Sequence, residues 1–406
     1  MKKIALLSLI ILTTFLAQGQ PQKEMTDFSK WSNTLDSNRH LASKAKDYNR
    51  CVSLINEWAG RYNQLSPVLQ KNFMGWKAGM YYNLACYYAL TSSKPNALDA
   101  FKTAVESGYR DYASTLTDSD LNSLRDEPIF KTELEKMREK GDYPYVLKNS
   151  GPYNNQPVGL GAFTYQDASA PELVAFKNKY KLDSVAGNGD EVSKFKNLLF
   201  WVHNAVRHDG NSNNPAQVNG DSLITVCKVQ NRGVNCRMMA SILRDVYQAE
   251  GFKARIVTCM PKDTLDNDCH VINVVWSNTL NKWVWMDPTF NAYLRDENGN
   301  YLNIEEVRAR LIAGSPVVLN DDANWNNKQK ETKEAYFNYM SKNLYWLKCS
   351  IKSEWDIESV KSGKPKIDYI NLYPGGFSTI HQPKLVGRGA IFYATSNPEY
   401  FWQKPE

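Results

Sequence analysis

The chain has 406 residues, of which 42% are hydrophobic and 12% aromatic, and its formal net charge is +6. A chain of this length and composition can bury more than one hydrophobic core, so we expect two or three domains. The weak positive charge is not gathered into runs of Lys and Arg interleaved with aromatic residues, which argues against a nucleic-acid surface.

The first 19 residues have the pattern of a secretory signal peptide. Lys2 and Lys3 give a positive start, Ile4–Leu16 an apolar centre, and Ala17–Gly19 the small residues of a cleavage site. The apolar centre is too short to span a bilayer, and no later stretch is long enough. The first cysteine is Cys51, so none stands at the cleavage point to carry a lipid. We therefore expect a secreted or periplasmic protein without a membrane span.

Residues 25–140 are predicted to form a helical domain. Residues 81–109 contain two helical patterns whose small and aromatic positions follow the spacing of one tetratricopeptide repeat, which this stretch resembles. These positions are Leu84, Ala85 and Tyr88 in the first helix and Ala97, Phe101 and Ala104 in the second. Such repeats bind partners on a concave surface when several of them stack. With one repeat-like unit, we slightly favour a helical cap over a partner-binding surface.

Residues 141–170 are rich in Pro, Gly and Asn and are predicted to be a linker, with one short strand at Tyr143–Leu147. Helical spacing then predicts helices at Pro171–Tyr180 and Glu191–His208. The second of these helices carries His203 and His208.

The centre of the sequence is the stretch from Gly233 to Asp287. Cys236 follows a Gly and an Asn, where a helix should begin, and Gly251 provides the stop. Apolar residues recur between them with helical spacing at Met239, Ile242, Leu243, Val246 and Tyr247. A thiol in the first turn of a helix lies at the positive end of the helix dipole, which favours the nucleophilic thiolate.

A strand at Phe252–Met260 and an antiparallel hairpin are predicted next. The hairpin joins His270–Ser277 to Lys282–Asp287 through a four-residue loop, so that Ser277 faces Lys282. In this register Asp287 lies diagonal to His270 on the same face of the sheet. A carboxylate there would hold the imidazole through one ring nitrogen and leave the other for Cys236, which is a nucleophile–base–orienter arrangement.

Three tryptophans lie on the same face of this predicted hairpin as His270 and Asp287. Each of them stands an even number of residues from His270 or Asp287 on its own strand, and side chains alternate between faces along a strand. They are Trp276, Trp283 and Trp285. We expect at least two of them to pack under the helix that begins at Cys236.

The stretch resembles the transglutaminase-like superfamily, a branch of the papain-like thiol enzymes. The matching residues, in the family's order, are Gly233-x-x-Cys236 opening a helix, Gly251-Phe-Lys-Ala-Arg255-Ile-Val before a strand, His270 starting a strand, and Trp285-Met-Asp287-Pro288. The resemblance implies that Cys236 is the nucleophile, His270 the base and Asp287 its orienter.

Related enzymes often take an oxyanion-binding group from upstream of the cysteine helix. Trp201, His203 and Asn204 are candidates for that role, and nothing in their spacing selects one. The backbone N–H of Cys236 is the donor that we name first.

The predicted catalytic core covers residues 171–320, and a C-terminal extension covers residues 321–406. Helices are predicted at Ile304–Ala313 and Thr332–Leu347, and strands at Tyr369–Leu372 and Ala390–Thr395. These strands either complete the catalytic sheet, which we prefer, or form a small appended β module.

No metal or cofactor is expected, because the five histidines form no His-x-x-x-His pair and no Cys-x-x-Cys is present. The acidic loop of Asp263, Asp266 and Asp268 lacks the spacing of a calcium loop. Seven cysteines leave at least one thiol free, and we expect that one to be Cys236. A bridge between Cys259 and Cys269 is conceivable.

The sequence therefore predicts an α+β protein in which a helical N-terminal domain precedes a papain-like core, with the cysteine helix packed on an antiparallel sheet. The predicted reaction is attack of the Cys236 thiolate on an amide carbonyl of a peptide or protein, with hydrolysis favoured over cross-linking. Two other interpretations remain open. One is a peptide-binding module that uses the same groove without chemistry, and the other is a helical adaptor with a structural C-terminal domain.

Overall fold

The computed structural model describes residues 4–266, 268–360, 363–377, 384–387 and 389–406, with side chains from residue 22 onward. The predicted signal peptide at residues 1–19 lies outside the residues whose side chains are described. The chain divides into two compact units, residues 1–142 and residues 143–406. Within the described residues, no helix combines the length and the apolar character needed to cross a membrane.

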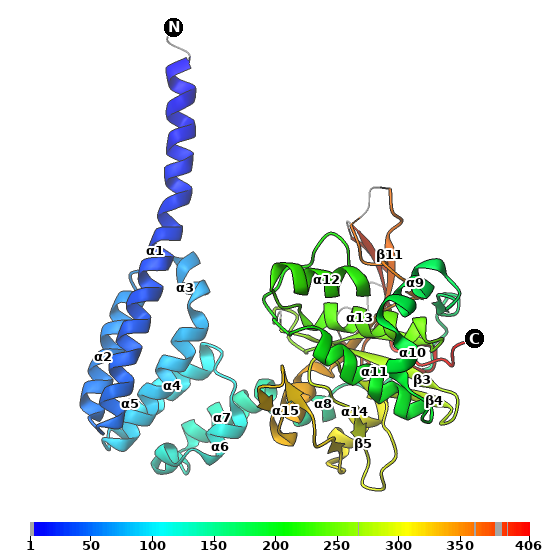
Figure 1. Cartoon of the computed structure of the whole chain (residues 1–406). Helices are drawn as coiled ribbons and strands as arrows, with labels where there is room; N and C mark the ends of the chain where they lie inside the picture. The colour runs from blue at the N-terminus through cyan, green and yellow to red at the C-terminus, as the bar shows by residue number, and fades with distance from the viewer. Residues whose placement is uncertain (1–3, 267, 361–362, 378–383, 388) are drawn as a thin grey trace. The chain divides into compact units, whose positions relative to one another are not determined.

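The first unit is helical throughout its described residues (Figure 1). Its elements are α1 (Ile4–Lys44), α2 (Tyr48–Tyr62), α3 (Pro67–Asn72), α4 (Met74–Leu90), α5 (Lys94–Glu106), α6 (Tyr112–Thr117), the 3-10 helix η1 (Ser119–Leu124) and α7 (Pro128–Gly141).

The helices α4 and α5 form the antiparallel pair that the repeat-like spacing predicts. Small side chains let the two helices approach closely, since Ala85, Ala97 and Ala104 are fully buried. Phe101 stacks on Phe130 of α7 with ring centroids 4.5 Å apart, which ties the next helix to the pair. The predicted helical character of residues 25–140 is confirmed.

The second unit is built around a seven-stranded sheet whose strand order is β12-β13-β11-β9-β2-β3-β4. All neighbouring strands are antiparallel except β11 and β13, which are parallel. The strands are β2 (Ala254–Met260), β3 (His270–Ser277), β4 (Lys282–Met286), β9 (Trp346–Ser350), β11 (Ile367–Leu372), β12 (Lys384–Val386) and β13 (Ala390–Thr395). The predicted C-terminal strands therefore complete the catalytic sheet, as we preferred, and the sheet is mixed.

Short ladders and helices complete the second unit. The two-stranded ladders pair β1 (Thr164–Tyr165) with β10 (Lys352–Ser353), β5 (Leu294–Arg295) with β6 (Val318–Leu319), and β7 (Asn324–Trp325) with β8 (Gln329–Lys330). The helices are α8 (Tyr143–Lys148), α9 (Pro171–Tyr180), α10 (Leu182–Ala186), α11 (Glu191–Ala205), α12 (Gly220–Gln230), α13 (Cys236–Ala249), α14 (Ile304–Ala313), α15 (Lys333–Asn343) and α16 (Pro398–Phe401).

Each face of the sheet carries its own hydrophobic core. On one face α13 packs on β2 and β3, and α9, α11 and α12 pack around α13. Apolar side chains on the other face of the sheet join α8, α14, α15 and the C-terminal residues. The central strands are thus covered on both sides and read as nearly continuous runs of buried residues.

The predicted hairpin register is confirmed. Ser277 faces Lys282 and Trp276 faces Trp283. The three tryptophans share one face, but the expectation that at least two pack under the cysteine helix was wrong. All three lie in the core opposite α13, whose apolar residues meet Val284 and Met286 instead. Hairpin parity predicts that residues share a face, but it does not say which face the helix covers.

Three element predictions need correction. The expected strand at Tyr143–Leu147 is the helix α8, which packs against α14 and α15. The helix expected at Thr332–Leu347 ends at Asn343, and the chain then enters β9. The helix that begins at Glu191 ends at Ala205, so His208 lies on the segment after it.

Arg255 is a buried cation that fastens the C-terminal residues to the sheet. Its guanidinium donates to the hydroxyl of Tyr165 at 2.6 Å and to the backbone carbonyls of Phe401 and Gln403 at 2.6 and 3.0 Å. It also lies 4.3 Å from the ring centroid of Trp283, a cation–π distance. Phe401 is therefore part of the core of this unit, and Gln403 is fastened to its edge.

Candidate active site

Cys236 is the first residue of α13, as the sequence predicts. The preceding Asn235 caps the helix, because its side-chain oxygen accepts from the backbone N–H of Met238 at 3.0 Å. The amide nitrogen of Asn235 donates to the carbonyl of Ser212 at 3.0 Å, which ties the cap to the upstream loop. The thiol therefore lies at the positive end of a well-capped helix.

The segment after α11 runs beside the residues that precede Cys236. The N–H of Asp209 donates to the carbonyl of Val234 at 2.8 Å, and the N–H of Val234 donates to the carbonyl of Arg207 at 2.9 Å. A Cβ on Gly233 would lie 2.4 Å from the Cβ of Asp209, so this close approach requires glycine. The bridge brings His208 next to the cysteine.

His270 and Asp287 are joined as the hairpin register predicts. The Nε2 atom of His270 lies 2.8 Å from Oδ2 of Asp287, and both side chains are almost fully buried. The same Oδ2 accepts from the hydroxyl of Tyr336 at 2.9 Å, and Oδ1 accepts from the N–H of Thr289 at 2.9 Å. The indole N–H of Trp285 in turn donates to the Tyr336 hydroxyl at 3.1 Å. Hydrogen bonds from β3, from α15 and from the segment after β4 thus hold the Asp287 carboxylate.

His208 and His270 line the same cavity as Cys236 and lower the pKa of its thiol. Burial raises the pKa of this thiol, but the hydrogen bonds from His208 and His270, together with their charges, outweigh burial and lower the pKa to about 6. For His270, burial lowers the pKa, and Asp287 and the Cys236 sulfur raise it to about 10. Between these values the site holds a thiolate and an imidazolium. Since Nε2 of His270 faces Asp287, Nδ1 is the nitrogen left for the sulfur.

The tautomer of His208 is fixed by a tryptophan. The indole N–H of Trp325 donates to Nδ1 of His208 at 3.0 Å. In the neutral ring the proton therefore lies on Nε2, the nitrogen left for Cys236. Asn326 holds the backbone of His208 from both sides, accepting from its N–H at 2.7 Å and donating to its carbonyl at 3.0 Å. Trp325 ends β7, and Asn326 opens the turn that connects β7 to β8.

Cys236 and His270 line a cavity of about 530 Å³. The wall beyond them is formed by α15, the loop before β3, and the strands β2 and β9. Other lining residues include His208, Arg237, Thr258, Phe290, Tyr339 and Lys348.

Comparison with known proteins identifies this region. The family model for the transglutaminase-like superfamily matches residues 178–288, a range that holds Cys236, His270 and Asp287. The chain contains a transglutaminase-like domain. Its α+β fold joins a helical N-terminal region to this core.

One solved structure also aligns with the chain. It is described as the crystal structure of an inferred cysteine protease from Cytophaga hutchinsonii, at 16% sequence identity and a TM-score of 0.23. The alignment covers 42% of the present chain and 57% of the matched chain. No curated protein matches the sequence.

The three upstream side chains that the sequence offered for an oxyanion site, Trp201, His203 and Asn204, lie away from the cavity. None of them is among the described residues that line the cavity. His203 bonds the carbonyl of Pro288 at 3.0 Å and the side chain of Asn324 at 2.9 Å. Asn204 bonds its own helix and Asn327, and Trp201 packs in the core around α13.

Sequence reasoning missed two residues of this site as functional candidates. His208 was assigned to a helix face, and no spacing rule relates it to Cys236. Tyr336 lies 49 residues after Asp287, in a helix that nothing in the sequence connects to the hairpin. Only the folded sheet brings α15 over the end of β4.

All seven cysteines have free thiols, including Cys259 and Cys269, for which a bridge was conceivable. Cys259 pairs with His270 across the sheet and is buried beneath the site. Cys269 lines the cavity, and burial together with the nearby Cys236 charge raises the pKa of its thiol.

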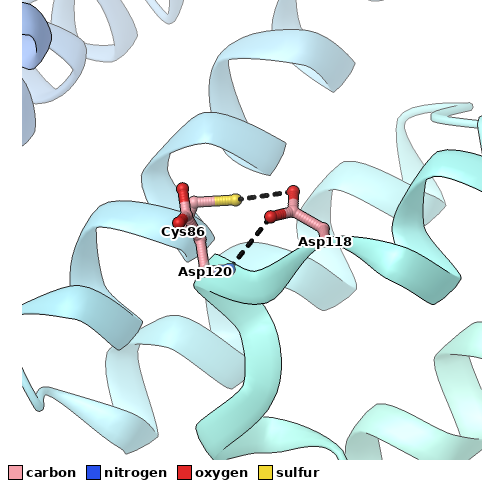
Figure 2. A group of neighbouring side chains, drawn as sticks. All are labelled: Cys86, Asp118 and Asp120. Atoms are coloured by element: carbon pink, nitrogen blue, oxygen red, sulfur yellow. Dashed lines mark hydrogen bonds between the residues drawn. The ribbon is translucent and has the colours of Figure 1, made fainter.

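In the helical unit, the ligand atoms of Cys86, Asp118 and Asp120 lie within 4.8 Å of one another (Figure 2). Asp118 caps η1 by accepting from the N–H of Asp120 at 3.0 Å, and it accepts from the hydroxyl of Tyr82 at 2.6 Å. Burial raises the pKa of the Cys86 thiol, so the thiol stays protonated and donates to Asp118. Helix capping therefore accounts for this group without an ion.

The two cysteines of the cavity should differ sharply in their pH profiles of alkylation. We expect iodoacetamide to modify Cys236 at half its maximal rate near pH 6, and Cys269 only above pH 9, because only the thiolate reacts. Peptide mapping after short exposures between pH 5 and 10 measures both. In His270→Ala the Cys236 profile should move upward by at least one pH unit. Equal labelling of both thiols at pH 6 in the wild-type protein would contradict the ion pair.

Proposed function

We propose that the protein is a secreted thiol enzyme that cleaves amide bonds of peptides or proteins through a thioester on Cys236. The observation that carries the proposal is the grouping of Cys236, His270 and Asp287. The buried imidazole and carboxylate are joined by a hydrogen bond of 2.8 Å, and the partly buried thiol lines the same cavity as the imidazole, which lowers its pKa. The match to the transglutaminase-like superfamily supports a cysteine-dependent reaction.

The proposed reaction starts from a thiolate on Cys236 and an imidazolium on His270. The Cys236 thiolate attacks the amide carbonyl and forms a C–S bond, and the carbonyl oxygen becomes an oxyanion. As the C–N bond breaks, His270 delivers its Nδ1 proton to the departing amine. His270 is then neutral and removes a proton from water, which attacks the thioester and releases the carboxylic acid. Asp287 keeps the ring in place and stabilises its charged form.

Two donors beside the sulfur are available to stabilise the oxyanion in this proposal. The backbone N–H of Cys236 is the first of α13 and has no acceptor within the helix. The Nε2–H of His208, which contacts the sulfur at rest, is the second. We assign His208 the stabilising role that the sequence offered to Trp201, His203 or Asn204. A pair of preorganised donors of this kind supplies much of the rate acceleration in acyl transfer.

Hydrolysis is favoured over transfer to an amine. Water is present at about 55 M, so transfer requires a site that excludes water and holds the acceptor beside the acyl group. The tryptophans of the hairpin, which are the obvious material for such a site, are buried in the core, and none of them is among the described residues that line the cavity. The cavity has Phe290 and Tyr339 as its aromatic residues among those described.

The test is mass spectrometry of a diverse peptide mixture after incubation with the enzyme and excess cadaverine. We expect fragments ending in a free carboxylate, and no fragments with the Cys236→Ala variant. Cadaverine adducts that require Cys236 would replace hydrolysis by amine transfer. The absence of any product from the wild type, with Cys236 still alkylated at pH 6, would favour a binding role for the groove.

Substitutions in the hydrogen-bond network behind His270 should reduce turnover by different amounts. Asp287→Asn should reduce kcat by several orders of magnitude, because the ring loses its orienting charge. Tyr336→Phe should reduce kcat by roughly 10-fold, since it removes one hydrogen bond to that carboxylate. Kinetics on a peptide from the mixture measure both, and circular dichroism checks the fold. A loss of less than 2-fold in Asp287→Asn would show that another group orients His270.

His208 should matter for the transition state and little for binding. We expect His208→Ala to lower kcat by about 100-fold with KM nearly unchanged, as removal of one oxyanion donor does in other acyl-transfer enzymes. His208→Gln, which keeps an N–H donor, should recover part of the loss. An effect confined to KM would assign His208 to substrate binding instead.

A further inference from the structure

The active-site cavity contains a lysine without an anionic partner. Lys348 of β9 lines the cavity, and within the described residues its ammonium makes neither a salt bridge nor a hydrogen bond. The ammonium lies over the rings of Tyr369 and Phe392, at cation–π distances of 5.5 and 6.0 Å from their centroids. Lysines are rarely held away from water without a partner, because desolvating the charge costs free energy.

The residues around Lys348 do not compensate for its charge. Arg237 forms a two-pronged contact with the carboxylate of Glu358, so these two charges cancel each other. Arg237 also donates to Thr258 at 3.0 Å and to Tyr369 at 3.1 Å. Asn371 faces Lys348 on β11, yet its buried side-chain oxygen has no hydrogen-bond partner, so the ammonium does not turn toward it.

The acidic residues of the cavity have partners of their own. Lys342 of α15 pairs with Asp266 at 3.2 Å and with Asp268 at 2.7 Å. Tyr339 donates to Asp268 at 3.1 Å. The described charge that remains available to a ligand in the cavity is therefore the positive charge of Lys348.

The strand register sets the distance of Lys348 from the reacting groups. Lys348 pairs with Thr258, which pairs with Val271 on the far side. Strands lie about 4.8 Å apart, so the Cα of Lys348 is about 10 Å from that of Val271, the neighbour of His270. One peptide residue spans about 3.5 Å. Lys348 lines the cavity, and at rest its ammonium lies near the rings of Tyr369 and Phe392. Its four-carbon stem is long enough to swing from there toward a group within about two residues of the attacked carbonyl.

We propose that Lys348 is an anion-binding subsite that selects substrates with a carboxylate within about two residues of the scissile amide. This inference rests on the proposed thiol chemistry at Cys236 and adds the substrate class. The carboxylate comes either from the end of a peptide or from an acidic side chain. Binding of this carboxylate would give the Lys348 ammonium the anionic partner that the described residues of the protein do not supply.

The protonation of Lys348 fits this role. Burial, followed by the charge of Arg237, lowers the pKa of Lys348 to about 8. The group is therefore still mostly cationic at pH 7, and a bound carboxylate would stabilise that charge further.

The experiment uses the full chain and matched haloacetyl probes that alkylate Cys236. The first series is N-bromoacetyl glycine, β-alanine and γ-aminobutyrate, each compared with its carboxamide, and it presents a terminal carboxylate at increasing distance. The second pair is N-bromoacetyl aspartic acid α-amide and its asparagine counterpart, which presents a side-chain carboxylate. Bromoacetamide measures the nucleophile alone. Rates come from intact mass and peptide mapping at pH 7.

We expect the carboxylate probe to react at least 10-fold faster than its amide at one spacing or more, and the series that shows this identifies the source of the carboxylate. In Lys348→Met the ratio should fall to about 1 while the bromoacetamide rate is unchanged. Met replaces a half-buried charge with an adaptable apolar chain, so the fold should persist. Lys348→Gln and the loss of the preference at 1 M salt in the wild type provide independent checks.

The two proposals fail in different ways. If bromoacetamide labels Cys236 readily but acid and amide probes react equally, or if Lys348→Met keeps the preference, the anion subsite is wrong and the thiol chemistry stands. If Cys236 resists all probes, both proposals fail together.

Discussion

The contact between the Cys236 sulfur and the His270 ring is the constraint on which the second unit depends. It keeps a thiolate and an imidazolium in a place that water reaches poorly, where each charge alone would be costly. Burial opposes the thiolate, and the lowered pKa of Cys236 shows that the two histidines outweigh burial. The ion pair persists because the surrounding structure offers partners for both charges.

Those partners come from widely separated parts of the chain. Asp287 follows β4, Tyr336 belongs to α15, and His208 is held by Trp325 near the β7–β8 turn. The two-faced sheet makes this convergence possible. The cysteine helix covers one face, α15 lies with the core on the other, and the reacting groups meet at the end of β3 where the two sides come together. This placement gives the site rigid support from both cores.

We assign the thiol chemistry and the selection of a substrate to different strands of the sheet. The reacting groups depend on β3, β4 and the start of α13, whereas Lys348 lies on β9 and reaches the cavity across β2. Arg237 follows the nucleophile directly but is neutralised by Glu358. The half-buried cation on β9 is consequently the group that we propose to discriminate between substrates by charge.

The sequence by itself determined the local features of this protein. Cap and stop residues predicted the helix that begins at Cys236, and strand alternation with a four-residue loop predicted the hairpin register that joins His270 to Asp287. These features depend on residues close in sequence, where helical and strand periodicities apply. Only the tertiary structure decided which face the tryptophans occupy, that Tyr336 bonds Asp287, and that His208 and Lys348 line the cavity with Cys236. Each of these contacts joins elements far apart in the chain, and no local period encodes the packing that brings them together.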